Sequence, residues 1–219
     1  MFNLFLKELL LGKGVSRILF NILLQDKMCY GKVLDIGGGH KINPSHMRFL
    51  KFAPGFEIQS VNISEKAQPD YLIDLETGAL PVADNFYDFV LAFNFFEHIL
   101  NIDKVALEFF RVLKKDGELI GFVPFLANVH PDPHDYCRYT KEKLIFMFKD
   151  HEFEKIEILS VGRGPFVAAY RQIEFVLPIF LRIFVVSICF CLDWFLRKIK
   201  PKFNFTDMCP LGYLFYVKK

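Results

Sequence analysis

Short apolar stretches alternate with amphipathic ones through the middle of the chain. Stretches rich in β-branched and aromatic residues, bounded by turn residues, predict strands at 32–36, 58–62, 71–73, 87–93, 118–123, 155–161 and 213–217. Helical periodicity is predicted at 44–50, 101–113 and 140–149, and Thr140 suits the N-cap of the last helix. Strands alternating with helices indicate an α/β fold with a doubly wound, mostly parallel sheet, whose ligands bind at the carboxyl ends of the strands.

The apolar start of the chain predicts one or two helices that reach to about Gln25. We expect no secretory signal here, because the first residues carry no positive charge and no small-x-small cleavage site follows. These helices either pack on the sheet or cap the ligand pocket.

Residues 175–192 form the most apolar segment, and their number is close to the roughly 20 residues needed to cross a bilayer. The charges around this segment recur at spacings near three and four residues, which places them on one stripe of a helix. They are Arg171, Glu174, Arg182, Asp193 and Arg197. Since the rest of the helix is apolar, we expect residues 173–199 to lie in a membrane interface, with the basic run 197–202 near anionic headgroups, or to form a homodimer contact.

The composition suits one globular domain, because 53% of the 219 residues are hydrophobic and 24% are charged. The net charge is only +2 and the one dense basic run is 197–202, so we expect no nucleic-acid partner. Five cysteines without a C-x-x-C pair indicate neither a disulfide framework nor a zinc site, and they favour a reducing cytoplasm.

A glycine turn, 37–39, follows the first predicted strand. The dinucleotide fingerprint G-x-G-x-x-G would need a third glycine at position 42, where the chain has isoleucine. The turn instead stands beside Asp35, an acidic residue at the end of the strand. This arrangement fits a cationic, amino-acid-like ligand better than a diphosphate.

Residues 33–39, Val-Leu-Asp-Ile-Gly-Gly-Gly, resemble motif I of the class I S-adenosylmethionine-dependent methyltransferases. Further motifs of the small methyltransferase-domain subgroup are matched in order at 70–75, 80–81, 84–90, 96–98 and 111–117. Residues 134–140 resemble a segment of members associated with polysaccharide biosynthesis. The resemblance implies a Rossmann-like sheet of seven strands with an antiparallel last strand.

With this resemblance, we expect a single domain over 1–219. It divides into an N-terminal helical segment (1–30), a cofactor-binding core (31–164), an apolar helical insertion (165–205) and a closing strand (210–219). In this family the closing strand pairs beside the sixth strand, here 155–161. Both strands must lie on one side of any membrane, so we expect the apolar segment not to span it.

The resemblance also implies S-adenosyl-L-methionine as cofactor. Asp35, Gly37 and Gly39 would hold its amino-acid moiety, and Asn94 would lie near its methionine portion. Asp74 and Leu75 would face the adenine. Asn62 stands where the family usually has the acidic residue that binds both ribose hydroxyls, which predicts weaker binding of the cofactor.

Methyl transfer to a hydroxyl needs a group that takes up the acceptor's proton, and histidine suits this role near neutral pH. The candidates are His134, His130 and His98, and His134 is expected to act with its neighbour Asp135. His98, Tyr136 and Arg138 are the candidate substrate-binding residues; alternatively, residues 134–139 form only a capping and ion-pair cluster. We expect no metal site at His130, Asp132 and His134, because the prolines between them hold the run extended.

These features together predict a cytoplasmic methyltransferase, peripheral on the inner face of a membrane, whose acceptor is a small molecule, a glycan or a lipid-linked compound. Two alternatives remain open at this point. One is an NAD-dependent oxidoreductase, which the glycine pattern disfavours. The other is a non-catalytic methyltransferase-like domain that binds a membrane or a partner through its apolar segments.

Overall fold

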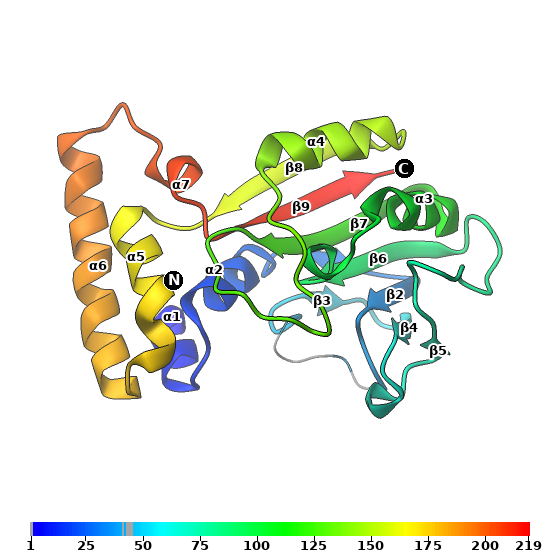
Figure 1. The fold of residues 1–219 in the computed structure, drawn as a ribbon, viewed down its shortest axis with the longest axis horizontal. Coiled ribbons are helices and arrows are strands. Elements are labelled where there is room, and N and C mark those ends of the chain that lie inside the picture. Colours follow the sequence, from blue (N-terminus) through cyan, green and yellow to red (C-terminus); the bar gives the residue numbers. More distant parts are fainter. Residues whose placement is uncertain (1, 41, 43–45) are drawn as a thin grey trace.

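A seven-stranded sheet forms the centre of the protein in the computed structural model, which describes residues 2–40, 42 and 46–219 (Figure 1). The sheet order is β5-β4-β2-β6-β7-β9-β8. Its strands are β2 (Lys32–Ile36), β4 (Glu57–Asn62), β5 (Tyr71–Leu72), β6 (Tyr87–Phe93), β7 (Leu113–Pro124), β8 (Glu154–Val161) and β9 (Gly212–Lys218). All pairs are parallel except those of β9, which runs antiparallel between β7 and β8. The predicted Rossmann-like α/β fold is therefore confirmed.

A second, two-stranded parallel sheet joins β1 (Met28–Cys29) to β3 (Lys51–Phe52) and was not predicted. The predicted helix at 44–50 is wrong over its described part, because residues 46–49 form a turn and bends and residue 50 has no regular secondary structure. Residues 44 and 45 lie outside the described residues. The backbone N–H of Arg48 donates to the side chain of Asn21 at 3.0 Å, so contacts with a neighbouring helix replace helical hydrogen bonds here.

Helices cover both faces of the sheet, and the side chains of β6 alternate between the two layers. Val90 and Ala92 face the layer of α3 (Ile102–Val112) and α4 (Lys141–Asp150). Phe89 and Leu91 face the layer that contains α2 (Val15–Leu23). Asn101 and Thr140 cap α3 and α4 through their side chains, as predicted for Thr140.

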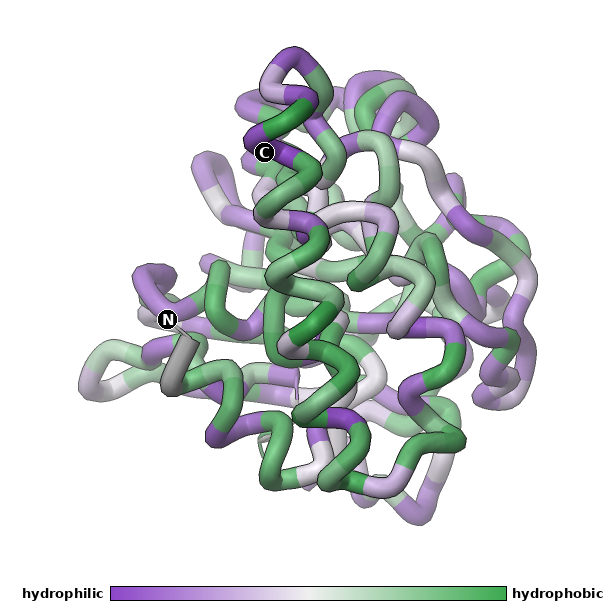
Figure 2. The backbone as a smooth tube through the Cα atoms, turned by 90° about the vertical axis from the view of Figure 1, so that its left-hand side faces the viewer, coloured by the Kyte–Doolittle hydropathy of each residue, from purple (hydrophilic) through white to green (hydrophobic). Residues whose placement is uncertain are grey.

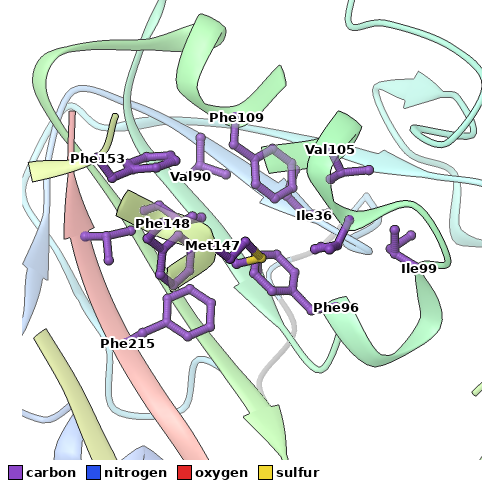
Figure 3. Packing of buried hydrophobic residues seen from close by; sticks show 14 of the residues in the cluster. Ile36, Val90, Phe96, Ile99, Val105, Phe109, Met147, Phe148, Phe153 and Phe215 are labelled. Atoms are coloured by element: carbon purple, nitrogen blue, oxygen red, sulfur yellow. The ribbon is translucent and has the colours of Figure 1, made fainter. Parts of the chain in front are cut away.

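Phenylalanine supplies much of the core. Figure 3 shows Phe96, Phe109, Phe148, Phe153 and Phe215 packed around one another between the sheet and its helices, and all five are buried. Each buried ring stabilises the fold by roughly 1.5–3 kcal/mol. This core accounts for part of the phenylalanine excess of the sequence.

The remaining helices gather at one end of the sheet (Figure 1). They are α1 (Phe2–Leu10), α5 (Pro165–Ile173), the 3₁₀ turn η3 (Glu174–Val176), α6 (Ile179–Ile199) and the short α7 (Phe205–Met208). The predicted stripe of charges along one helix from Arg171 to Arg197 is wrong, because the helix is broken between α5 and α6. Pro178, which has no backbone N–H, is the N-cap of α6.

Two buried carboxylates of this region, Asp193 and Glu174, cap neighbouring helices. Asp193 of α6 accepts hydrogen bonds from the backbone N–H groups of Phe166 and Val167, both at 3.0 Å, at the start of α5. Glu174 accepts from the N–H of Val15, at 2.9 Å, at the start of α2. Because β9 follows α6 and pairs with β7 and β8, both ends of α6 are tied to the same sheet.

Candidate active site

The glycine turn closes over the end of β2. Gly37 has a φ of +76°, which favours glycine, and its N–H donates to the carbonyl of Val61 at 2.8 Å. A Cβ at Gly37 would meet nothing within 4 Å, whereas one at Gly39 would overlap the carbonyl oxygen of Ala67. Gly37 thus faces open space, and Gly39 allows the turn to pack on the 3₁₀ turn η1 (Glu65–Ala67).

A cleft of about 740 Å³ lies beside this turn, at the carboxyl ends of β2, β4 and β6. We call it the cofactor cleft. Six of the seven predicted cofactor residues line it: Asp35, Gly37, Asn62, Asp74, Leu75 and Asn94. Gly39 does not line it. His98, His134 and Tyr136 also line it.

Asp35 is 5% exposed at the bottom of the cofactor cleft. Burial raises the pKa of its carboxyl group to about 7. An ammonium group bound beside it would favour the ionised carboxylate and lower this pKa. Asp35 is therefore suited to a cationic ligand, as its position in the sequence predicted.

Asn62 supports the glycine turn. Its amide N–H groups donate to the carbonyls of Gly37 and Gly38, both at 2.9 Å, and its Oδ1 accepts from the N–H of Ser64 at 2.9 Å. These bonds use both donors of the amide, so only an acceptor lone pair remains for a ribose hydroxyl.

A second cleft, of about 710 Å³, adjoins the first, and Asn94 lines both. We call it the acceptor cleft. Its described lining has three cationic side chains, Lys13, Arg17 and Arg171, against one carboxylate, Glu174. Burial and the positive charge of Arg171 lower the pKa of Arg17. The cleft is thus electropositive, and the exposed apolar residues Leu11 and Phe175 lie at its rim.

Two histidines stand where the clefts meet. His98, from the 3₁₀ turn η2 (Phe96–His98), lines the cofactor cleft, and His130 lines the acceptor cleft. Their rings meet edge to face, with 5.4 Å between centroids. Glu97 lies between them, fully buried, and its carboxylate raises the pKa of His130.

Asp135 acts on His130 rather than on His134. Its carboxylate accepts from the N–H of His130 at 2.9 Å and pairs with Arg138. His134 is exposed, and its ring lies 5.1 Å from that of Tyr136 on the wall of the cofactor cleft. Arg138 lines neither cleft, so the structure brings His98, His130, His134 and Tyr136 to the site and leaves Arg138 and Asp135 behind it.

Glu97 was not predicted as a site residue. A carboxylate between phenylalanine and histidine in an otherwise apolar run was the available signal. The cationic residues Lys13, Arg17 and Arg171 were also missed, because they are far apart in the sequence and only the fold brings them to one cleft.

Comparison with known proteins gives one family match, over the part of the chain that holds most of the cofactor cleft. Residues 34–121 match the family described as "Methyltransferase domain". A comparison with curated proteins gave no match.

Solved structures share the fold at low sequence identity. A SAM-dependent methyltransferase from Archaeoglobus fulgidus is 16% identical with a TM-score of 0.54, and the alignment covers 94% of this chain and 93% of that one. Phosphoethanolamine N-methyltransferase 2 of Haemonchus contortus, solved with S-adenosyl-L-methionine, is 18% identical with a TM-score of 0.54, covering 91% of this chain and 52% of that one. An O-methyltransferase of a Brevibacillus brevis multienzyme, solved with S-adenosyl-L-homocysteine, is 15% identical with a TM-score of 0.52, covering 86% and 66%.

Proposed function

We propose that this chain is a class I S-adenosylmethionine-dependent methyltransferase and that it methylates a hydroxyl group of an anionic, lipid-linked acceptor. When bound, the cofactor supplies an electrophilic methyl group on a sulfonium sulfur. The observation that carries the proposal is the pair of clefts that meet at Asn94. Two reactants held in adjoining clefts gain rate from proximity and alignment.

The residues of the cofactor cleft fit S-adenosylmethionine. The carboxylate of Asp35 suits the ammonium group, and the open backbone at Gly37 permits close approach of the amino-acid moiety. The Oδ1 of Asp74 accepts from the N–H of Glu76 at 2.9 Å, which leaves acceptor capacity for the adenine amine. Asn62 stabilises the turn and offers the ribose no carboxylate.

The acceptor cleft favours a ligand that is both anionic and apolar. Arg171 pairs with Glu174 at 3.0 Å and also repels Arg17, so a phosphate or carboxylate bound among Lys13, Arg17 and Arg171 would offset that repulsion. Leu11 and Phe175 at the rim offer apolar contact to the rest of the ligand. A lipid-linked sugar phosphate combines these properties.

His134 is the proposed proton acceptor. Its ring lines the cofactor cleft, and its ring nitrogens have no hydrogen-bond partner among the described residues. It would take the hydroxyl proton as the O–CH₃ bond forms and the S–CH₃ bond breaks, with the bonding pair left on sulfur.

The apolar face of α6 would bring the acceptor cleft to a membrane surface. Phe180, Phe184 and Trp194 are each at least 58% exposed, and Figure 2 shows this largely hydrophobic helix along one side of the molecule. The helix is long and apolar enough to cross a bilayer by length and composition. Because both its ends return to one sheet, we propose that it lies in the interface instead, with 197–202 near anionic headgroups.

The test is transfer of a labelled methyl group from S-adenosylmethionine to a lipid-linked sugar phosphate, with the matched free sugar and free sugar phosphate as comparisons. The lipid-linked compound should be methylated fastest and the uncharged sugar slowest. His134→Gln should lower turnover by about 100-fold or more while the affinity for S-adenosylhomocysteine stays unchanged. Equal rates for all three acceptors would contradict the proposed acceptor class, and normal turnover of the variant would contradict the role of His134.

A further inference from the structure

Glu97, His98 and His130 converge at the junction of the two clefts. The Nε2 atom of His98 lies 3.7 Å from Oε1 of Glu97, and the Nε2 atom of His130 lies 3.6 Å from the same oxygen. The three ligand atoms all lie within 4.8 Å of one another. Neither carboxylate oxygen has a hydrogen-bond partner among the described residues, although the side chain is fully buried.

The outer ring nitrogens determine which atoms of the histidines face Glu97. Nδ1 of His98 donates to the carbonyl of His134, and Nδ1 of His130 donates to the carbonyl of Asn128 at 2.8 Å. A neutral imidazole with its proton on Nδ1 has a lone pair on Nε2. When both rings are neutral, two nitrogen lone pairs and a carboxylate therefore meet with no hydrogen between them.

Such a cluster of electron-pair donors is unfavourable unless a metal ion or a proton lies among them, because a buried carboxylate without a partner is costly. Tetrahedral ligands at about 2.0–2.1 Å from a zinc ion are about 3.4 Å apart. The observed separations between the carboxylate oxygen and the two imidazole nitrogens, 3.6 and 3.7 Å, need to close by only a few tenths of an ångström, and the two nitrogens lie within 4.8 Å of each other. Backbone carbonyls that hold the far ring nitrogens are the usual outer partners of metal-bound histidines.

We propose that Glu97, His98 and His130 bind a divalent transition-metal ion such as Zn²⁺ or Co²⁺. Two histidines and one carboxylate are a common ligand set for such ions, and they leave coordination positions for water or a substrate oxygen. His98 and His130 belong to different clefts, so the bound ion would lie between them. The next step rests on the proposed function: the acceptor hydroxyl would occupy an open coordination position of the ion, and the positive charge of the ion would lower the pKa of that hydroxyl.

Metal binding is measured on the full chain after treatment with EDTA, in the absence of cofactor and acceptor. Titration with Co²⁺, followed by its visible absorption, and with Zn²⁺, followed by calorimetry, should each give one equivalent bound. Glu97→Gln keeps the size of the side chain and should weaken binding by more than the roughly 10- to 100-fold that outer partners contribute. His134 lies in the same loop as His130 but is not one of the proposed ligands, so His134→Gln should bind both metal ions as tightly as the wild type does.

His130→Asn provides a second ligand variant if Glu97→Gln fails to fold. No binding of either metal to the wild type would overturn the proposal, as would equal binding by the wild type and a folded ligand variant. If no metal ion binds, an ion pair between protonated His130 and the carboxylate of Glu97 would explain why these side chains lie close together. Binding of S-adenosylhomocysteine should be unchanged in Glu97→Gln, so failure of the metal site and failure of the cofactor assignment are separate results.

Discussion

Asp35 makes cofactor binding depend on pH. Its pKa is raised by burial from 3.8 to about 7, whereas pairing with an ammonium group requires the ionised form. Below pH 7, ligand binding must therefore remove a proton from Asp35. Calorimetry should show that the affinity for S-adenosylhomocysteine falls as the pH is lowered from 7 to 5.5, by up to about tenfold per pH unit.

The matched variant Asp35→Asn is nearly isosteric but cannot ionise. Its affinity should be lower than that of the wild type at pH 7 and should change little over the same range. An affinity of the wild type that stays constant from pH 5.5 to 7 would contradict the pairing of Asp35 with the ligand's ammonium group.

Asp193 tests how the helices at one end of the sheet are held together. Its carboxylate pairs two backbone N–H groups at the start of α5, whose own N-cap, Gly164, has no side chain to do so. Asp193→Ala should lower the free energy of unfolding in urea by about 2 kcal/mol, since it removes a cap and leaves buried donors unpaired.

Asp150→Ala, at the exposed C-terminal end of α4, is the control and should change the free energy of unfolding by less than about 0.5 kcal/mol. Similar losses in the two variants would show that Asp193 does not cap α5 in solution.

The elements that local patterns specify were predicted well. The strand β6 and the helix that begins after Thr140 are examples, because adjacent residues specify them: an apolar, aromatic-rich run bounded by turn residues in the strand, and a capping threonine at the start of the helix. The segment 46–50 was missed because Arg48 is held by Asn21 of α2, a contact that is distant in the sequence. The helix break at Pro178 could have been predicted from the sequence, because proline has no backbone N–H, but the regular spacing of the charges favoured one continuous helix.

The same distinction applies to the site. Asp35 and Gly37 follow directly from one strand and its turn, so the sequence located them. The neighbour in sequence of His134 is Asp135, yet its carboxylate binds the N–H of His130, because the loop turns back on itself. Glu97 and the cations of the acceptor cleft could not be predicted as site residues, because only tertiary packing brings them next to their partners.

At the scale of the whole molecule, the exposed face of α6 predicts binding to anionic lipid vesicles. Phe180 and Phe184 are 67% and 65% exposed, and burying each ring in a bilayer interface contributes up to roughly 1.5–3 kcal/mol. The double substitution of both by serine should weaken vesicle binding by about tenfold or more in a flotation assay. High salt should also weaken vesicle binding of the wild type, because it screens the attraction between the basic run 197–202 and the anionic lipids.

Phe146→Ser is the control, because Phe146 is 63% exposed on α4, far from α6. Its vesicle binding should equal that of the wild type. The membrane proposal would be contradicted if the wild type did not bind vesicles but formed dimers that dissociate when Phe180 and Phe184 are replaced. That result would identify the exposed face of α6 as a subunit contact.

The most direct test of the central claim is calorimetric titration of the purified chain with S-adenosylhomocysteine and, separately, with NAD. The fold and the cofactor cleft predict saturable binding of S-adenosylhomocysteine at one site per chain. This binding should be abolished by Gly37→Arg, which fills the open space beside the turn, and no binding of NAD is expected. Binding of NAD, or failure of the folded wild-type chain to bind S-adenosylhomocysteine, would contradict the account.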